Sequence, residues 1–577
     1  MKWNKIIVNL FFILTLYLNA TSALDNYEYD ENNTSITPIT STNKNYFEKY
    51  DVQEELINTK IKNSRINIFL PLTSYIYISK LINGTLLRSS QNTQGWEFMM
   101  AVSSTKVDPL TYDFFLRKGA KFQDGTSFNA NSVIENFIYF KKSPYVYSDF
   151  HKRVKGVEKI SDYHIRFHLI KPYGMLYHDL TTINLYSSKY LSKYGWSAGV
   201  GADSLANSMA EPGPYGLGPY ILIEGFATGQ KQTPIIQLKA NPFYYEEGLP
   251  YIENITVYTE LATKEMLQMA LEKERLDITP IPFNKKIETV LSPYSRLYIK
   301  PSTNVIINSF NLLKPNGKLK DQKIRIALNK ALDQTNLLNF LYKKEGVISP
   351  TETSANFLAI KPIIKSLHTW NEIYHENNET PEQLKEILNG LHLKVITIDH
   401  YMFLWKGIEH QLKQYGVTLE IKSTADESEV IDQLLKNRKI PQEWDILTTG
   451  NDDWFSKNPW SSIFMYDLSN DWCSLEKDDY LQNLIQHLFD YDFNSVEFND
   501  QVSKIVHHVH EKAYMLFIPS PNVVLAVNKE VFFEPSSILL MPLWKAKITR
   551  FHWSVRGNTP YPDEHKRPMY PLKFDLD

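Results

Sequence analysis

The chain has 577 residues, of which 43% are apolar and 22% charged, and its formal net charge is -3. A chain of this length exceeds one ordinary domain, so we expect at least two substantial lobes. The small net charge gives no indication of nucleic-acid binding. Aromatic residues make up 13% of the chain, which fits either a cleft lined by rings or a wide core.

The first segment has the features of an export signal. Residues 1–5 form a short basic head, residues 6–18 are largely apolar, and residues 19–23 supply small side chains for cleavage after Ser22 or Ala23. The apolar run is too short for a membrane span, which needs about 20 residues. Because the only cysteine is Cys473, no lipid-anchor cysteine follows the signal. The sequence therefore predicts an exported, soluble periplasmic protein without a lipid anchor.

The elements that follow alternate between strand-like and helix-like segments, which predicts an α/β or α+β fold. Residues 24–60 read as a flexible lead-in with a candidate helix over 46–60, and the folded body is expected to begin near Ile61. Predicted strands cover residues 65–70, 112–116, 220–223, 304–310 and 444–449, and predicted helices begin at Asn129 or cover residues 187–194, 323–333 and 498–516.

One block predicts its local structure in detail. The run LRKGAKFQDGTSFNANSV, residues 116–133, contains turns at 117–119 and 124–125, where Gly125 is available for positive φ. Asn129 then caps a helix, since the apolar residues that follow it recur at helical spacing. These are scaffold roles rather than chemical ones.

This block resembles the pattern L-R-x-G-x-x-F-x-D-G-x-x-F-x-A-x-x-V of the family 5 extracellular solute-binding proteins of ABC transporters, which include oligopeptide-, dipeptide- and nickel-binding members. Further resemblances follow in the family's order. Residues 216–220 (GLGPY) are similar to G-T-G-P-Y, residues 241–245 (NPFYY) to N-P-x-Y-W, and residues 323–333 (KIRIALNKALD) to V-R-Q-A-L-x-x-A-I-D. The resemblance covers roughly residues 66–531, and the tail after Phe551 matches no family motif.

The resemblance implies a two-lobed, periplasmic-binding-protein-like α/β fold of the large type II or cluster C form, with mixed sheets flanked by helices. Its hinge would consist of two crossover strands, near residues 302–313 and 514–522, on which the lobes close. The implied divisions are a signal peptide (1–23), the lead-in (24–60), the first part of lobe I (61–302), lobe II (303–519), and the return segment of lobe I with the tail (520–577).

Three motifs suggest other chemistry, and each lacks the context it needs. GWSAG at 195–199 matches the serine-hydrolase elbow, but a predicted helix precedes Ser197 where a strand is required. His507, His508 and His510 lack metalloprotease spacing, so solvated or pairing histidines are favoured over a metal site. GLG at 216–218 lacks the lysine and serine of a phosphate loop. We therefore expect no enzyme activity, no cofactor and no metal.

The stretch GNDDWFSKNPW, residues 450–460, carries the predicted binding site. In peptide-binding members of the family, an aspartate in a loop after a lobe II strand receives the free α-amino group of the ligand. The corresponding pattern, close to W-x-A-D-Y-x-D-P, places that aspartate on Asp452, with Asp453 one residue away. A carboxylate suits this role, because burying an unpaired ammonium costs several kcal/mol. A turn or helix-cap aspartate is the alternative.

Aromatic residues complete the predicted site. Trp454 and Trp460 would wall the pocket, and from lobe I the residues Tyr75, Tyr77 and Trp96 lie where relatives place cleft residues. The prediction is a monomeric periplasmic receptor that captures a peptide or similar amino-bearing solute, delivers it to an inner-membrane ABC permease, and binds no nucleic acid. An oligosaccharide, an opine or a nickel chelate on the same fold stays open as the ligand. A secreted serine hydrolase and a periplasmic chaperone or signalling receptor stay open as other classes.

Overall fold

The structure is a computed structural model that describes residues 39–40, 61–71, 74–90, 92–143, 148–196, 212–227, 232–303, 305–357, 359–451, 453, 457–533, 542–569 and 571–573. The chain divides into two compact units, Met1–Ile39 and Thr40–Asp577, and nearly all described residues belong to the second. The predicted signal segment and the candidate helix 46–60 lie outside the described residues. Within the predicted lead-in 24–60, residues 39–40 form a short strand.

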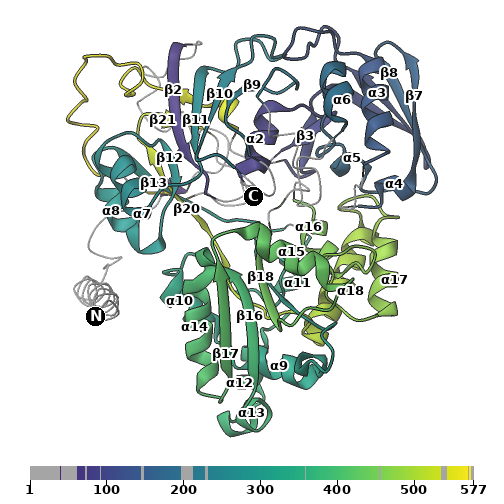
Figure 1. Cartoon of the computed structure of the whole chain (residues 1–577), viewed down its shortest axis with the longest axis vertical. Coiled ribbons are helices and arrows are strands. Elements are labelled where there is room, and N and C mark those ends of the chain that lie inside the picture. Colours follow the sequence, from purple (N-terminus) through teal and green to yellow (C-terminus); the bar gives the residue numbers. More distant parts are fainter. Residues whose placement is uncertain are drawn as a thin grey trace, which may run out of the picture. The chain divides into compact units, whose positions relative to one another are not determined.

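The large sheet takes strands from both the first and the last part of the described chain (Figure 1). Its strand order is β1-β23-β13-β20-β12-β2-β11-β10-β9. β2 pairs in parallel with β11 and β12, whereas β20 pairs antiparallel with β12 and β13. The strands are β1 (Ile39–Thr40), β2 (Ile61–Phe69), β9 (Tyr220–Glu224), β10 (Ile235–Ala240), β11 (Ile252–Tyr258), β12 (Ile278–Pro280), β13 (Ser295–Lys300), β20 (Val523–Asn528) and β23 (Leu572–Lys573).

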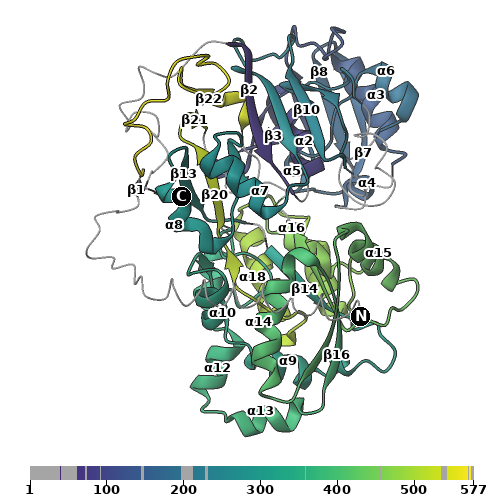
Figure 2. The same ribbon diagram turned by 60° about the vertical axis from the view of Figure 1, so that its left-hand side comes forward.

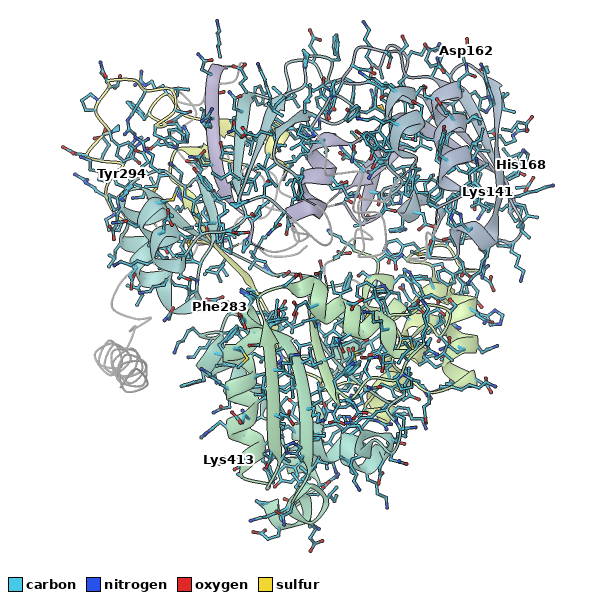
Figure 3. All side chains as sticks on the ribbon, viewed as in Figure 1. Lys141, Asp162, His168, Phe283, Tyr294 and Lys413 are labelled. Atoms are coloured by element: carbon cyan, nitrogen blue, oxygen red, sulfur yellow. The ribbon has the colours of Figure 1, made fainter. Side chains whose placement is uncertain are left out.

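The small sheet is antiparallel, in the order β5-β6-β8-β7, and lies at the far right of Figure 1. Asp162 and His168 lie at its outer margin (Figure 3). Its strands are β5 (Ala101–Asp108), β6 (Thr111–Leu116), β7 (Val154–Ser161) and β8 (His164–Leu169), with the hairpin β3 (Leu87–Ser89) and β4 (Trp96–Phe98) beside it. The helices of this part of the chain are α2 (Ser74–Ile82), α3 (Ala130–Phe140), α4 (Phe150–Arg153), α5 (Leu176–Asp179), α6 (Ser188–Tyr194), α7 (Thr263–Leu267), η2 (Gln268–Glu272), η3 (Phe283–Lys285) and α8 (Lys286–Leu291).

The mixed sheet, in the order β14-β18-β16-β17, has helices packed around it (Figure 2). β14 pairs antiparallel with β18, and β16 pairs in parallel with β18 and β17. The strands are β14 (Val305–Phe310), β16 (His392–Ile398), β17 (Thr418–Thr424) and β18 (Ile446–Asn451). The helices are η4 (Lys318–Lys320), α9 (Gln322–Lys330), α10 (Gln334–Leu341), α11 (Lys361–Ile364), α12 (Trp370–Glu376), α13 (Pro381–Leu388), η5 (Asp399–Tyr401), α14 (Met402–Lys413), α15 (Glu427–Asn437), α16 (Trp460–Ile463), η6 (Phe464–Tyr466), α17 (Asp479–Leu488) and α18 (Val496–Lys512).

The chain passes between the large and mixed sheets in both directions. On the way out β13 ends at Lys300 and β14 begins at Val305, and on the return α18 ends at Lys512 and β20 begins at Val523. The return passage carries β19 (Ser520–Pro521), which pairs with β15 (Gly346–Val347). Beside these passages Phe283, labelled in Figure 3, packs edge-on against Tyr342 with 5.2 Å between ring centroids. The two passages and this packing join the two sheets on one side of the molecule.

Several predicted elements are confirmed with small shifts at their ends. The Asn129 side chain caps α3 by accepting from Asn131 N at 2.9 Å, and Gly125 has φ +85° in the predicted turn. The predicted helix 498–516 ends early at Lys512, because Ala513 adopts a left-handed conformation with φ +47° that stops it. Among the described residues, no helix combines the length and apolar character needed to cross a membrane.

After β21 (Val531–Phe532) the chain forms η7 (Leu543–Lys545) and β22 (Lys547–Ile548). The tail that follows β22 is attached to the large sheet through a buried carboxylate. Asp277, which is fully buried, accepts on Oδ1 from Asn528 Nδ2 at 2.8 Å, His552 Nε2 at 2.9 Å and Trp553 Nε1 at 2.9 Å. Its Oδ2 accepts from Asn67 N at 2.7 Å. The chain then returns to the sheet as β23, parallel to β13. The segment without a family motif is therefore an integral part of this fold.

Candidate ligand-binding site

The predicted binding loop begins where β18 ends, next to the outward passage between the sheets. The register of the β14–β18 pair sets Asn451 opposite Val305, so residue 453 lies beside residue 303. Thr303 Oγ1 donates to Asp453 Oδ2 at 2.9 Å, and Lys457 N donates to the same oxygen at 2.8 Å. The Asp453 side chain is 5% exposed. The buried Asp453 carboxylate thus connects the predicted binding loop to the chain segment that passes from β13 to β14, which is one of the two predicted hinge segments.

The structure describes the packing of Trp460, whose role as a pocket wall stays a prediction. It begins α16, is 1% exposed, and packs edge-on against Phe489 with 4.6 Å between ring centroids. Its backbone N donates to Asn458 Oδ1 at 3.0 Å, and Asn458 Nδ2 lies 3.0 Å from Met175 Sδ. The ring therefore fills space between the loop and its neighbours. Asp452 and Trp454 lie outside the described residues.

The predicted residues of lobe I lie on two separate elements. Tyr77, on α2, is buried and lines a small apolar pocket whose other lining residues are Ile68, Leu70, Lys80, Leu81, Leu543 and Trp544. Burial lowers the pKa of Lys80 to about 8, and its Nζ donates to Thr181 O at 2.6 Å. Trp96, on β4, is half-buried and stacks on Tyr177 with 4.7 Å between ring centroids. The side chain of Tyr75 lies outside the described part.

Polar residues that the sequence analysis did not single out surround the passage. Lys300 ends β13 and is buried, and burial lowers its pKa to about 7. Ser302 O accepts from Ser354 Oγ at 3.0 Å and from Asn356 Nδ2 at 2.7 Å. Glu352 is buried in the same loop, and burial raises the pKa of its carboxyl. The polar run SPTETS at 349–354 was the sequence feature that could have pointed to these residues. Nothing in the neighbouring sequence indicated that the run would be buried.

The structure describes the surroundings of two of the motifs that suggest other chemistry. Gly195 ends α6 with φ +74° and its N–H donates to Leu191 O, as predicted for a helix cap, and Ser197 lies outside the described residues. His508 Nε2 pairs with Asp478 Oδ2 at 2.7 Å, and His510 Nδ1 lies 2.9 Å from Pro350 O. The prediction of pairing histidines is confirmed for both. Within the described ranges, no group of three or more His, Cys, Asp or Glu side chains is placed to hold a metal ion.

Comparison with known proteins gives concordant results. The family model described as bacterial extracellular solute-binding proteins, family 5 middle, matches residues 96–393. The glutathione-binding protein GsiB of Shigella flexneri serotype 5b (strain 8401) is 25% identical over 271 residues, which cover 44% of this chain and 48% of GsiB. The chain therefore matches about half the length of this relative.

Solved structures are similar over most of the chain. The binding protein DppA from Helicobacter pylori in complex with peptide STSA has a TM-score of 0.67 at 16% identity, covering 85% of this chain and 99% of that one. NikA from Brucella suis in complex with Fe(III)-EDTA has a TM-score of 0.67 at 16% identity, covering 84% of this chain and 100% of that one. These likenesses show the two-lobed α/β fold with mixed sheets flanked by helices.

Proposed function

Because the chain belongs to the family 5 bacterial extracellular solute-binding proteins, we propose that it captures a peptide or similar amino-bearing solute between two lobes and delivers it to an ABC permease. The large and small sheets would form lobe I, from residues 61–302 and 520–577, and the mixed sheet would form lobe II, residues 303–519. The two passages between the sheets would serve as the hinge on which the lobes close.

The observation that carries this proposal is the buried Asp453 carboxylate at the end of β18. Its Oδ2 is oriented by Thr303 and by the backbone of Lys457, so the charge is held in place before any ligand arrives. A preoriented carboxylate stabilises a ligand ammonium better than a mobile one, since less ordering is needed on binding. We therefore assign the role of amine acceptor to Asp453, with Asp452 as the alternative.

The names of two similar proteins favour an amino-bearing solute over the other ligands. The similar proteins named above are a glutathione-binding protein and a binding protein with a bound peptide, and both ligands carry amino groups. A metal chelate remains an alternative ligand, because NikA was solved in complex with Fe(III)-EDTA. The predicted oligosaccharide and opine also remain alternatives, since the fold does not determine the ligand. A receptor of this kind would act without catalysis, as a monomer, in the periplasm and without a lipid anchor.

Native mass spectrometry of the gently purified chain tests the solute class. We expect a series of retained masses that correspond to peptides or other free-amine compounds and disappear on denaturation. Retention of a sugar or a metal chelate with no amine-bearing species would contradict the proposed class. Cleavage of bound peptides or esters during incubation would instead favour the hydrolase alternative.

A further inference from the structure

A second contact joins the predicted lobes, away from the passages between the sheets. Residues 486–494 include the end of α17 and most of the link to α18, and they meet residues 149–179, which include α4 and α5. Figure 1 shows α4 above α17 on the right of the molecule, whereas the returning strand β20 lies to the left of centre. In this view the two connections lie on opposite sides of β18, the strand that precedes Asp453 (Figure 1).

An arginine from lobe I reaches into lobe II at this contact. Arg153 Nη1 lies 2.5 Å from Asp490 Oδ1 and donates to Pro172 O at 2.8 Å, and its Nη2 donates to Gln486 O at 3.0 Å. The Arg153 side chain is only 8% exposed. Burial alone would raise the pKa of Asp490, but hydrogen bonds from Arg153 and His487 hold it below its ordinary value. Because Arg153 is buried while Asp490 is 34% exposed, this charge-assisted pair is partly shielded from water and is worth more than a fully exposed pair.

The two backbones also touch directly. Gly174 N donates to Phe489 O at 2.9 Å, and a Cβ placed on Gly174 would lie 1.6 Å from Tyr491 O. The other close atoms that this Cβ would meet are Tyr491 C at 2.5 Å and Asp492 Cα at 3.1 Å, which also belong to residues 486–494. Glycine is therefore needed at position 174 for the approach of the lobes rather than for the fold of lobe I.

Residues 492–494 make further apolar and polar contacts with lobe I. His178 packs edge-on against Phe493 with 4.4 Å between ring centroids, and burial lowers the pKa of His178 to about 3, so this ring is neutral. Asn494 Nδ2 donates to Thr93 O at 3.1 Å, and Lys106 Nζ lies 3.0 Å from Asp492 Oδ2. The titratable groups that face this contact are thus a neutral histidine and paired charges.

We propose that residues 486–494 form a latch that closes onto Arg153 and Gly174 of lobe I and sets solute affinity through the closing equilibrium. This inference rests on the proposed function, because it assumes that closure traps a solute. A solute that binds only the closed form has its apparent affinity reduced in proportion to the fraction of protein able to close. Latch residues therefore determine affinity by positioning the lobes.

Two variants remove the latch in independent ways, and each has a matched control. Arg153→Gln deletes the charge across the contact, and its control is Arg166→Gln, which breaks an arginine–aspartate pair with Asp113 inside the small sheet. Gly174→Ala inserts a methyl group where the lobes meet, and its control is Gly156→Ala in β7, where a Cβ would meet no atom within 4 Å. A cooperative thermal unfolding transition in every variant would establish that the chain still folds.

The measurements are small-angle scattering and hydrogen exchange, each with and without a mixture of free-amine tri- to pentapeptides. We expect Arg153→Gln and Gly174→Ala to be more expanded than wild type, to lose protection at the backbone amide of position 174, and to bind the peptides at least about tenfold more weakly. The controls should match wild type. If the peptides do not bind, the scattering and exchange differences still support the latch, and only the proposed solute class fails.

Two outcomes would overturn the latch. In the first, both latch variants are as compact and as protected as wild type in every condition, whatever their peptide affinity. In the second, wild type binds the peptides and is still expanded with and without them, which would mean that the contact does not form in solution.

Discussion

At the residue scale, an experiment can determine which of the adjacent aspartates, Asp452 or Asp453, binds the amino group of the solute. Asp453→Asn keeps the shape and the hydrogen bond from Thr303 but removes the charge, so it should weaken binding of free-amine peptides by about tenfold or more. N-acetylated forms of the same peptides carry no ammonium and should lose far less. Isothermal titration with both peptide forms measures the difference, and Asp452→Asn is the matched neighbour.

The opposite pattern would assign the amine role to Asp452. If both variants weaken acetylated and free peptides equally, then neither carboxylate receives an amine, and the turn or cap reading of this loop would hold. The loop pattern alone could not decide between the two, because one residue of register changes which side chain faces inward.

Asp277 provides a test of the tail at the same scale. Asp277→Ala would leave the amide of Asn67 and the side chains of His552 and Trp553 without their buried acceptor. Because stranded buried polar groups are costly, we expect a loss of about 3 kcal/mol or more in the free energy of unfolding. Chemical denaturation measures it, and Asp563→Ala, at an exposed pair with Lys566, should change little. A loss below about 1 kcal/mol at Asp277 would contradict its role as the main acceptor.

At the element scale, docking of the tail should depend on pH. Burial alone would raise the pKa of the Glu530 carboxyl, but hydrogen bonds from His565, Thr549 and Tyr561 hold it below its ordinary 4.5. A lowered pKa means that the group stabilises the fold above 4.5, and that this contribution is lost as pH falls through the lower folded value. Unfolding free energies measured across this range should fall more steeply for wild type than for Glu530→Gln. If the free energies of unfolding of wild type and Glu530→Gln depend on pH in the same way, Glu530 is not the group that makes docking of the tail pH-dependent.

The predictions of helices and strands were correct where neighbouring residues determine the structure, and wrong where contacts between distant parts of the chain determine it. Asn129 and Gly195 were placed correctly because caps depend on a few neighbouring residues. The strand predicted over 444–449 runs instead over Ile446–Asn451, so its end was misplaced by two residues. β23 went unpredicted because two residues carry no periodic signal and form a strand only by pairing with β13.

At the scale of the whole molecule, capture of the solute should stabilise both lobes together. A ligand at about 100 times its Kd adds about 2.7 kcal/mol to the free energy of unfolding if it binds only the native state. We expect the solute identified by mass spectrometry to raise the thermal midpoint of the stripped chain in proportion to the logarithm of its concentration. A midpoint that does not respond to that solute would argue against specific capture.

Chain length alone predicted at least two lobes, but their arrangement was predictable only through the ordered family motifs, since no spacing within the chain indicates that residues 303 and 453 meet. The same motifs predicted the candidate site, in the loop at 450–460 together with Tyr75, Tyr77 and Trp96 of lobe I. The surrounding groups, Lys300 and Glu352, could not be found, because their burial results from the packing of segments that lie far apart in the sequence. The latch residues escaped notice for the same reason.

The strand order of the large sheet has a consequence for biosynthesis. β13 lies between β20 and β23, which come from residues 523–573, whereas the mixed sheet is complete once residue 451 has emerged. A growing chain can therefore assemble the mixed sheet while β13 still has both of its edges unpaired. Exposed strand edges favour pairing with other chains, so a truncated or stalled product should aggregate. Residues 523–573 would then decide whether a chain escapes aggregation, since only a chain that contains β20 and β23 covers both edges of β13.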